Sequence, residues 1–185
     1  MLAVTAAPHG FVAVGVAGAG PAAWTSAGGQ AWTEVRLPLP AGTASAVLNQ
    51  VASRGRLVVA AGTATTTSGQ QLPFTARSSD GGATWTASTL PGPAGPAHLT
   101  ALTAAGNEFL ATGTSGATPG HQDVVVWTSA TGSAWTAAMP GGRGLTGPGI
   151  QAITALTTSG DTVTGVGFSA SQSGEQPVFW QSPIR

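Results

Sequence analysis

The sequence predicts an all-β protein, and three observations carry this prediction. Short runs of β-branched and aromatic residues are separated by turns rich in glycine, proline, asparagine and serine. No segment shows an apolar period of 3.6 residues, and the threonine and glycine content disfavours helices. One strand-like run that ends in glycine also recurs at intervals of about 50 residues. Repeats of this length that contain several strands are typical of β-propeller blades.

Two landmarks define the repeat. The glycine-terminated run occupies residues 11–15, 58–62, 109–113 and 163–167. A second short motif follows each run, at residues 24–26, 77–79, 127–129 and 180–182, and begins with tryptophan in three copies and with Arg77 in the other. We therefore expect a single β-propeller over residues 1–185, with four blades at about 1–40, 41–94, 95–142 and 143–185.

Each blade is expected to contain four short strands. In the third repeat these are residues 98–105, 108–114, 123–129 and 134–139, with turns between them. In the first repeat, residues 2–6 and 10–16 match the first two strands. The apolar start of the chain is therefore interpreted as part of a blade, and it also lacks the positive charge of a secretory signal.

The last blade is incomplete by this reading. The fourth repeat offers strands at 151–159, 161–168 and 177–182, and no fourth strand. Three interpretations follow: a fragment of a propeller of six to eight blades, a self-contained ring of four blades, or a half-ring that dimerises. An open arc exposes apolar blade faces, so self-association through open blade edges is expected.

Composition excludes several classes of function. The 185 residues include 6 basic and 6 acidic side chains, so the formal net charge is zero. Without a basic cluster, neither a nucleic acid nor an anionic membrane is an expected partner. No apolar stretch is long enough for a membrane span. The chain has no cysteine, which excludes disulfides, thiolate metal sites and cysteine nucleophiles.

One turn carries a recognisable motif. Residues 78–85 read Ser-Ser-Asp-Gly-Gly-Ala-Thr-Trp, and this segment resembles the Asp box, or BNR repeat, of sialidase-like propellers. Residues 25–32 and 128–135 keep the glycine and the tryptophan but have alanine in place of Asp80. The resemblance covers the whole chain at the level of the repeat and about eight residues at the level of the motif.

The motif is interpreted as structural. Asp carboxylates accept N–H groups within tight turns, and glycine permits positive φ. The tryptophans, which recur at equivalent places, are expected to pack between blades. The predicted structural residues of the box are Ser78, Asp80, Gly82, Thr84 and Trp85.

The resemblance implies sialidase chemistry, which needs a tyrosine nucleophile, an acid and an arginine triad. The chain contains no tyrosine, and its arginines do not recur at equivalent positions in the repeats. No catalytic residue is therefore assigned. The family resemblance favours an extracellular location, and the alanine, glycine and threonine content, with arginine as the only strongly basic residue, suggests a GC-rich bacterial genome.

Polar residues in the loops that would converge at a propeller axis are the candidates for a binding pocket. They are His98, His121, Asp123, Arg143 and Glu175. Their spacing matches no metal-binding motif, so neither a metal nor a cofactor is expected. The sequence thus favours a noncatalytic binding or scaffold module with a glycan or protein ligand. The alternative is a fragment of a glycoside hydrolase whose catalytic residues lie outside this chain. A two-carboxylate hydrolase within the chain also stays open, and Asp123 and Glu175 are the acids to test for it.

Overall fold

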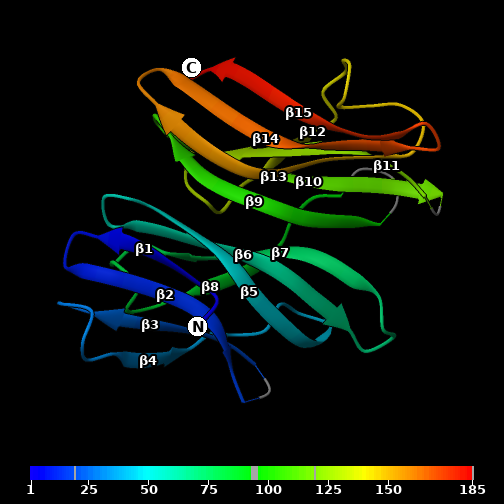
Figure 1. Cartoon of the computed structure of the whole chain (residues 1–185). Coiled ribbons are helices and arrows are strands. Elements are labelled where there is room, and N and C mark those ends of the chain that lie inside the picture. Colours follow the sequence, from blue (N-terminus) through cyan, green and yellow to red (C-terminus); the bar gives the residue numbers. More distant parts are fainter. Residues whose placement is uncertain (19, 93–95, 119, 185) are drawn as a thin grey trace. The chain divides into compact units, whose positions relative to one another are not determined.

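The computed structural model describes residues 1–18, 20–92, 96–118 and 120–184, and its described residues form strands, turns and loops without a helix (Figure 1). The prediction of an all-β protein is confirmed. Among the described residues, no helix is long and apolar enough to cross a membrane.

The strands form three sheets. The first sheet, in the order β1-β2-β3-β4, contains β1 (Ala3–Ala7), β2 (Gly10–Ala17), β3 (Gly20–Ser26) and β4 (Thr33–Arg36). The second sheet, in the order β5-β6-β7-β8, contains β5 (Thr43–Arg54), β6 (Leu57–Thr66), β7 (Gln71–Ser78) and β8 (Thr86–Thr89).

The remaining seven strands form one sheet with two antiparallel parts. The third repeat supplies β9 (Ala97–Ala105), β10 (Glu108–Thr118), β11 (His121–Ser129) and β12 (Thr136–Ala138). The fourth repeat supplies β13 (Ile150–Ser159), β14 (Thr162–Ser171) and β15 (Gly174–Pro183). A single parallel pair, Gln122 with Ile150, joins the two parts.

The predicted β-propeller is wrong. The three sheets have four, seven and four strands, and none of them closes or curls into a barrel or a propeller. The repeat period correctly indicated a recurring run of antiparallel strands in each repeat. It carries no information on how the sheets are joined, which depends on contacts between residues far apart in the sequence.

The chain divides into two compact units. The first comprises Met1–Leu90 and Thr131–Ser133, and the second comprises Pro91–Ala130 and Ala134–Arg185. In the first unit, apolar residues of the first two sheets form one core that includes Val12, Leu48, Phe74 and Trp85. In the second unit, two smaller clusters contain Leu110 with Val163, and Val124 with Ile153.

Close backbone packing explains the repeated glycine. In three repeats a β-bulge adds one residue to the first strand, at Asn49, Thr100 and Thr154. The glycines opposite these bulges are Gly62, Gly113 and Gly167, and a Cβ at any of them would overlap a backbone carbonyl oxygen of the bulged strand. Only glycine fits there.

The second strand of each repeat gives the sheets two distinguishable faces. We call them the Val12-type face, on which β2 places Val12 and Val14, and the Phe11-type face, on which it places Phe11 and Ala13. The same names apply to β6, β10 and β14, because these strands align with β2 in the repeat. In the first unit, the Val12-type face of the first sheet packs on the Phe11-type face of the second, which contains Val58 and Ala60.

In the second unit, too, a Val12-type face packs on a Phe11-type face. Leu110 lies on the Val12-type face of the third repeat, and Val163 lies on the Phe11-type face of the fourth; the two share one cluster. Thr112 strengthens this packing, because its hydroxyl donates a hydrogen bond of 3.2 Å to the Ile153 carbonyl. Both observed pairs therefore bring unlike faces together, in the same order along the chain.

Strand register corrects one part of the sequence alignment. Trp24, Trp127 and Trp180 pair with Ala13, Ala111 and Gly165 of the second strand. The equivalent second-sheet residue, Ala60, pairs with Ala76, so Ala76 and not Arg77 occupies the tryptophan position. The repeated serine is accordingly Ser78, matching Ser26 and Ser129, and the complete Asp-box turn is one residue longer than the turn after Ser26.

Candidate functional site

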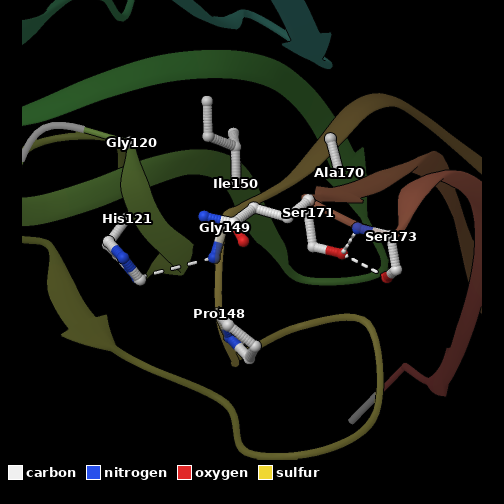
Figure 2. A pocket seen from close by; sticks show the side chains of 9 residues that line it. Gly120, His121, Pro148, Gly149, Ile150, Ala170, Ser171 and Ser173 are labelled. Atoms are coloured by element: carbon white, nitrogen blue, oxygen red, sulfur yellow. Dashed lines mark hydrogen bonds between the residues drawn. The ribbon is translucent and has the colours of Figure 1, made fainter.

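A hollow of about 830 Å³ lies in the second unit (Figure 2). Three segments supply its walls: the turn between β10 and β11, the segment that enters β13, and the turn between β14 and β15. The described residues that line it are Gly120, His121, Pro148, Gly149, Ile150, Ala170, Ser171, Gln172 and Ser173.

Backbone hydrogen bonds hold one wall against β11. The amide of Val124 donates to the Leu145 carbonyl, and the amide of Gln122 donates to the Gly149 carbonyl, both at 2.9 Å. Gly149 has a φ of 93°, and a Cβ there would overlap the carbonyl oxygen of Ala170. The segment can therefore lie close to both β11 and the end of β14 only with glycine at this position.

A buried side chain fixes the neighbouring residue of this wall. Gln151 is 1% exposed, and its Nε2 donates to the carbonyl of Pro148 at 3.1 Å and to the hydroxyl of Ser169 at 3.4 Å. Pro148 lines the hollow, so Gln151 positions the wall without lining the cavity itself.

Two of the five predicted pocket residues contact this wall. The Gly149 amide donates a long hydrogen bond of 3.5 Å to Nδ1 of His121, and the Gly147 amide donates one of 3.0 Å to Oδ1 of Asp123. His121 lines the hollow (Figure 2), whereas the Asp123 carboxylate binds the loop backbone.

The other three predicted pocket residues lie elsewhere. Arg143 lines a separate hollow of about 350 Å³, together with Gln176 and Phe179. Glu175 pairs with Ala170 across β14 and β15, next to the larger hollow, but it does not line it. His98 lies on β9 opposite Thr114. The five residues therefore do not form one cluster.

The serine and glutamine residues of the β14–β15 turn were missed by sequence reasoning. The hydroxyls of Ser171 and Ser173 lie 2.7 Å apart, and the Ser173 amide donates to the Ser171 hydroxyl at 3.3 Å. A related pair, Thr66 and Ser68 at 2.9 Å, occurs in the β6–β7 turn. This recurrence of two hydroxyls before a glycine was the available signal in the sequence.

The Asp box forms a dense network of hydrogen bonds inside the first unit. Oδ1 of Asp80 accepts hydrogen bonds from the Ser78 hydroxyl at 2.7 Å and from the Ala83 and Thr84 amides, both at 3.0 Å. Oδ2 accepts the Thr84 hydroxyl at 2.6 Å. Hydrogen bonds from Thr84, and then from Ser78, hold the pKa of this carboxyl well below its usual range.

The rest of the box connects the turn to the core. The Gly82 amide donates to the Ser78 hydroxyl at 2.8 Å, and the indole Nε1 of Trp85 donates to the Gly82 carbonyl at 2.9 Å. Trp85 is 8% exposed and belongs to the core between the first two sheets. These contacts are what a structural staple requires, and they use the acceptor capacity of Asp80 within its own turn.

The described residues contain no group of three or more His, Asp or Glu side chains placed to hold a metal ion. Comparison with known proteins adds no family: no protein-family model matches the chain, and no curated protein matches it.

Proposed function

We propose that the chain is a noncatalytic binding module and that the hollow beside His121 binds a neutral saccharide. The observation that carries the proposal is the chemistry of its described lining, which combines hydroxyl, amide and imidazole groups with short apolar residues. Such groups donate and accept hydrogen bonds without imposing a charge. The volume of about 830 Å³ lies within the range of small-molecule sites.

The lining argues for binding in preference to hydrolysis. Glycoside hydrolysis ordinarily uses two carboxyl groups that flank the scissile bond. The described lining includes neither an acid nor an arginine, and the Asp123 carboxylate accepts the Gly147 amide instead. An anionic sugar would lack a cation to pair with its carboxylate, so a neutral sugar is the better fit.

Calorimetry with a panel of neutral oligosaccharides tests the proposal. The variants His121→Ala and Gln172→Ala should each weaken binding about tenfold, the loss expected when a hydrogen bond of about 1.4 kcal/mol is removed. Gln176→Ala is the matched control, because this residue lies in the separate hollow with Arg143. No binding across the panel, or equal loss in the control, would contradict the proposal.

A fluorogenic glycoside assay tests the alternative, a glycoside hydrolase. The proposal predicts no turnover. Turnover that is abolished by Asp123→Asn or Glu175→Gln would replace the binding module with a two-carboxylate enzyme.

A further inference from the structure

Two sheet faces, one on the first sheet and one on the fourth repeat, carry five of the ten large apolar side chains that are exposed among the described residues. On the first sheet, Leu2 just before β1, Val4 on β1 and Phe11 on β2 are 61%, 60% and 40% exposed. Val166 and Phe179 are 45% and 67% exposed and pair with each other across β14 and β15. The strands concerned, β1 and β2 in the first sheet and β14 and β15 in the fourth repeat, are labelled in Figure 1.

The exposed face of the first sheet is a Phe11-type face. Val4 pairs with Ala13, which places it on the same face as Phe11. In the second sheet the equivalents of Phe11 and Ala13 are Val58 and Ala60, both 0% exposed because the first sheet covers them. The equivalent of Val4 is Val51, which packs against the same core.

The tryptophan that ends the turn is also buried in the second sheet and more open in the first. Trp85 is buried in the core between the first two sheets, whereas its equivalent, Trp32, lines an open apolar hollow of about 300 Å³ together with Leu2 and Val4. In the second sheet this face is covered by a neighbouring sheet. The first sheet presents the same kind of face, but no neighbouring sheet covers it among the described residues.

The exposed face of the fourth repeat is a Val12-type face. Phe179 pairs with Val166, the position that corresponds to Ala23 opposite Val14 in the first sheet and to Val126 opposite Thr112 in the third repeat. Ala23 and Val126 both pack into cores between sheets. Phe179 is the exposed member of this set.

We propose that these two faces bind each other between two copies of the chain. The Phe11-type face of the first sheet in one copy would cover the Val12-type face of the fourth repeat in the next. This contact continues the rule that both internal interfaces follow, in which unlike faces pack together. It is heterologous, because the two surfaces differ, so it either closes into a ring of copies or extends as a filament.

Area and charge are consistent with a weak contact of this kind. With strands about 4.8 Å apart and about six residues of 3.3 Å rise in each, the four strands of the first sheet cover roughly 400 Å², and the three strands of the fourth repeat cover roughly 300 Å². Together the two faces would bury roughly 700 Å², which is below the range of about 1,200–2,000 Å² for stable interfaces and within that of weak, transient contacts. The charged Glu34 and Arg36 of edge strand β4 form an ion pair with each other, so they leave no net charge on the first of these faces.

Sedimentation velocity over a wide range of protein concentration tests the proposal, and Val4→Arg and Phe179→Arg are the informative variants. Each places a charge on one of the two faces and leaves the other intact. Both sites are largely exposed, so thermal melting should show folded protein. Each variant alone should weaken association at least about tenfold. Met139→Arg is the matched control, because Met139 is 47% exposed but lies outside both sheets of the contact.

Sedimentation of a mixture of the two variants is the decisive experiment. The intact Phe11-type face of Phe179→Arg should bind the intact Val12-type face of Val4→Arg, giving a one-to-one dimer that grows no further. Three results would overturn the proposal: a wild-type chain that stays monomeric at every concentration, a mixture that stays monomeric, or an equal loss of association in Met139→Arg.

Discussion

The first and second sheets share one strand order but differ at equivalent positions, and the differences follow from what covers each sheet. The second sheet buries Trp85 under the first, and its turn contains Asp80. The first sheet has Ala27 in a turn one residue shorter, where the Gly29 amide still donates to the Ser26 hydroxyl at 2.8 Å and Trp32 Nε1 to the Gly29 carbonyl at 3.0 Å. The indole contact therefore survives without the carboxylate, whereas burial depends on a neighbouring sheet.

The two tryptophans give the largest expected difference. Trp85→Ala should lower the free energy of unfolding by about 3–5 kcal/mol, because it leaves a cavity in the core. Trp32→Ala should cost only about 1 kcal/mol, since the indole is partly exposed. Urea denaturation of the two variants measures both values, and equal losses would break the comparison.

The repeated glycine gives the next difference. A Cβ at Gly62 would overlap the Val47 carbonyl oxygen, whereas a Cβ at Gly15 would lie 3.0 Å from its nearest neighbour, Met1 Cα, so that a small shift accommodates it. Gly62→Ala should therefore destabilise by about 2–3 kcal/mol, the range for overpacking. Gly15→Ala should cost less than about 1 kcal/mol. A harmless Gly62→Ala would show that the bulge does not need glycine.

Removal of the Asp80 carboxylate should have a smaller effect on stability. Adding a carboxylate at the equivalent position of the first sheet should not stabilise it. Asp80→Ala removes a charged acceptor of four hydrogen bonds and should cost about 1–3 kcal/mol. Ala27→Asp should change stability by less than about 0.5 kcal/mol, because the shorter turn lacks the matching donors. A gain of stability in Ala27→Asp would contradict the difference in turn length.

The smallest effect concerns acid stability. Because folding lowers the pKa of Asp80 below its ordinary value of 3.8, this carboxylate contributes stability above that value and loses it as the pH falls further. Asp80→Asn should remove this part of the acid dependence, so the wild-type advantage over the variant should shrink below about pH 4. An advantage that stays constant down to pH 2 would contradict the network.

Local structure was predictable from the sequence. The strands expected at 98–105 and 108–114 match β9 and the first part of β10, because asparagine and glycine mark the turn between them. The join of the third and fourth repeats was not predictable, since the strand pair of Gln122 with Ile150 and the shared apolar clusters link residues far apart in the sequence. The alignment error at Arg77 arose because the longer turn after Ser78 shows only in the strand register.

The candidate site was predicted only in part. His121 was identified because the sequence predicts a loop there, before a strand; the structure has it as the first residue of β11. Pro148, Gly149 and the 171–173 turn were missed, because they line the hollow through tertiary packing of loops and carry no motif. Arg143 and Glu175 were grouped with His121 on the assumption of a common axis, which the three separate sheets do not provide.

The first sheet packs its Val12-type face on the second sheet, and an engineered disulfide tests this packing most directly. The hydroxyls of Thr5 on β1 and Ser53 on β5 lie 3.5 Å apart, and the chain contains no cysteine of its own. Thr5→Cys with Ser53→Cys should form an intramolecular disulfide on mild oxidation, whereas Val4→Cys with Ser53→Cys should not, because Val4 points to the opposite face. Failure of the first pair to form a disulfide, or equal oxidation of both pairs, would contradict this packing.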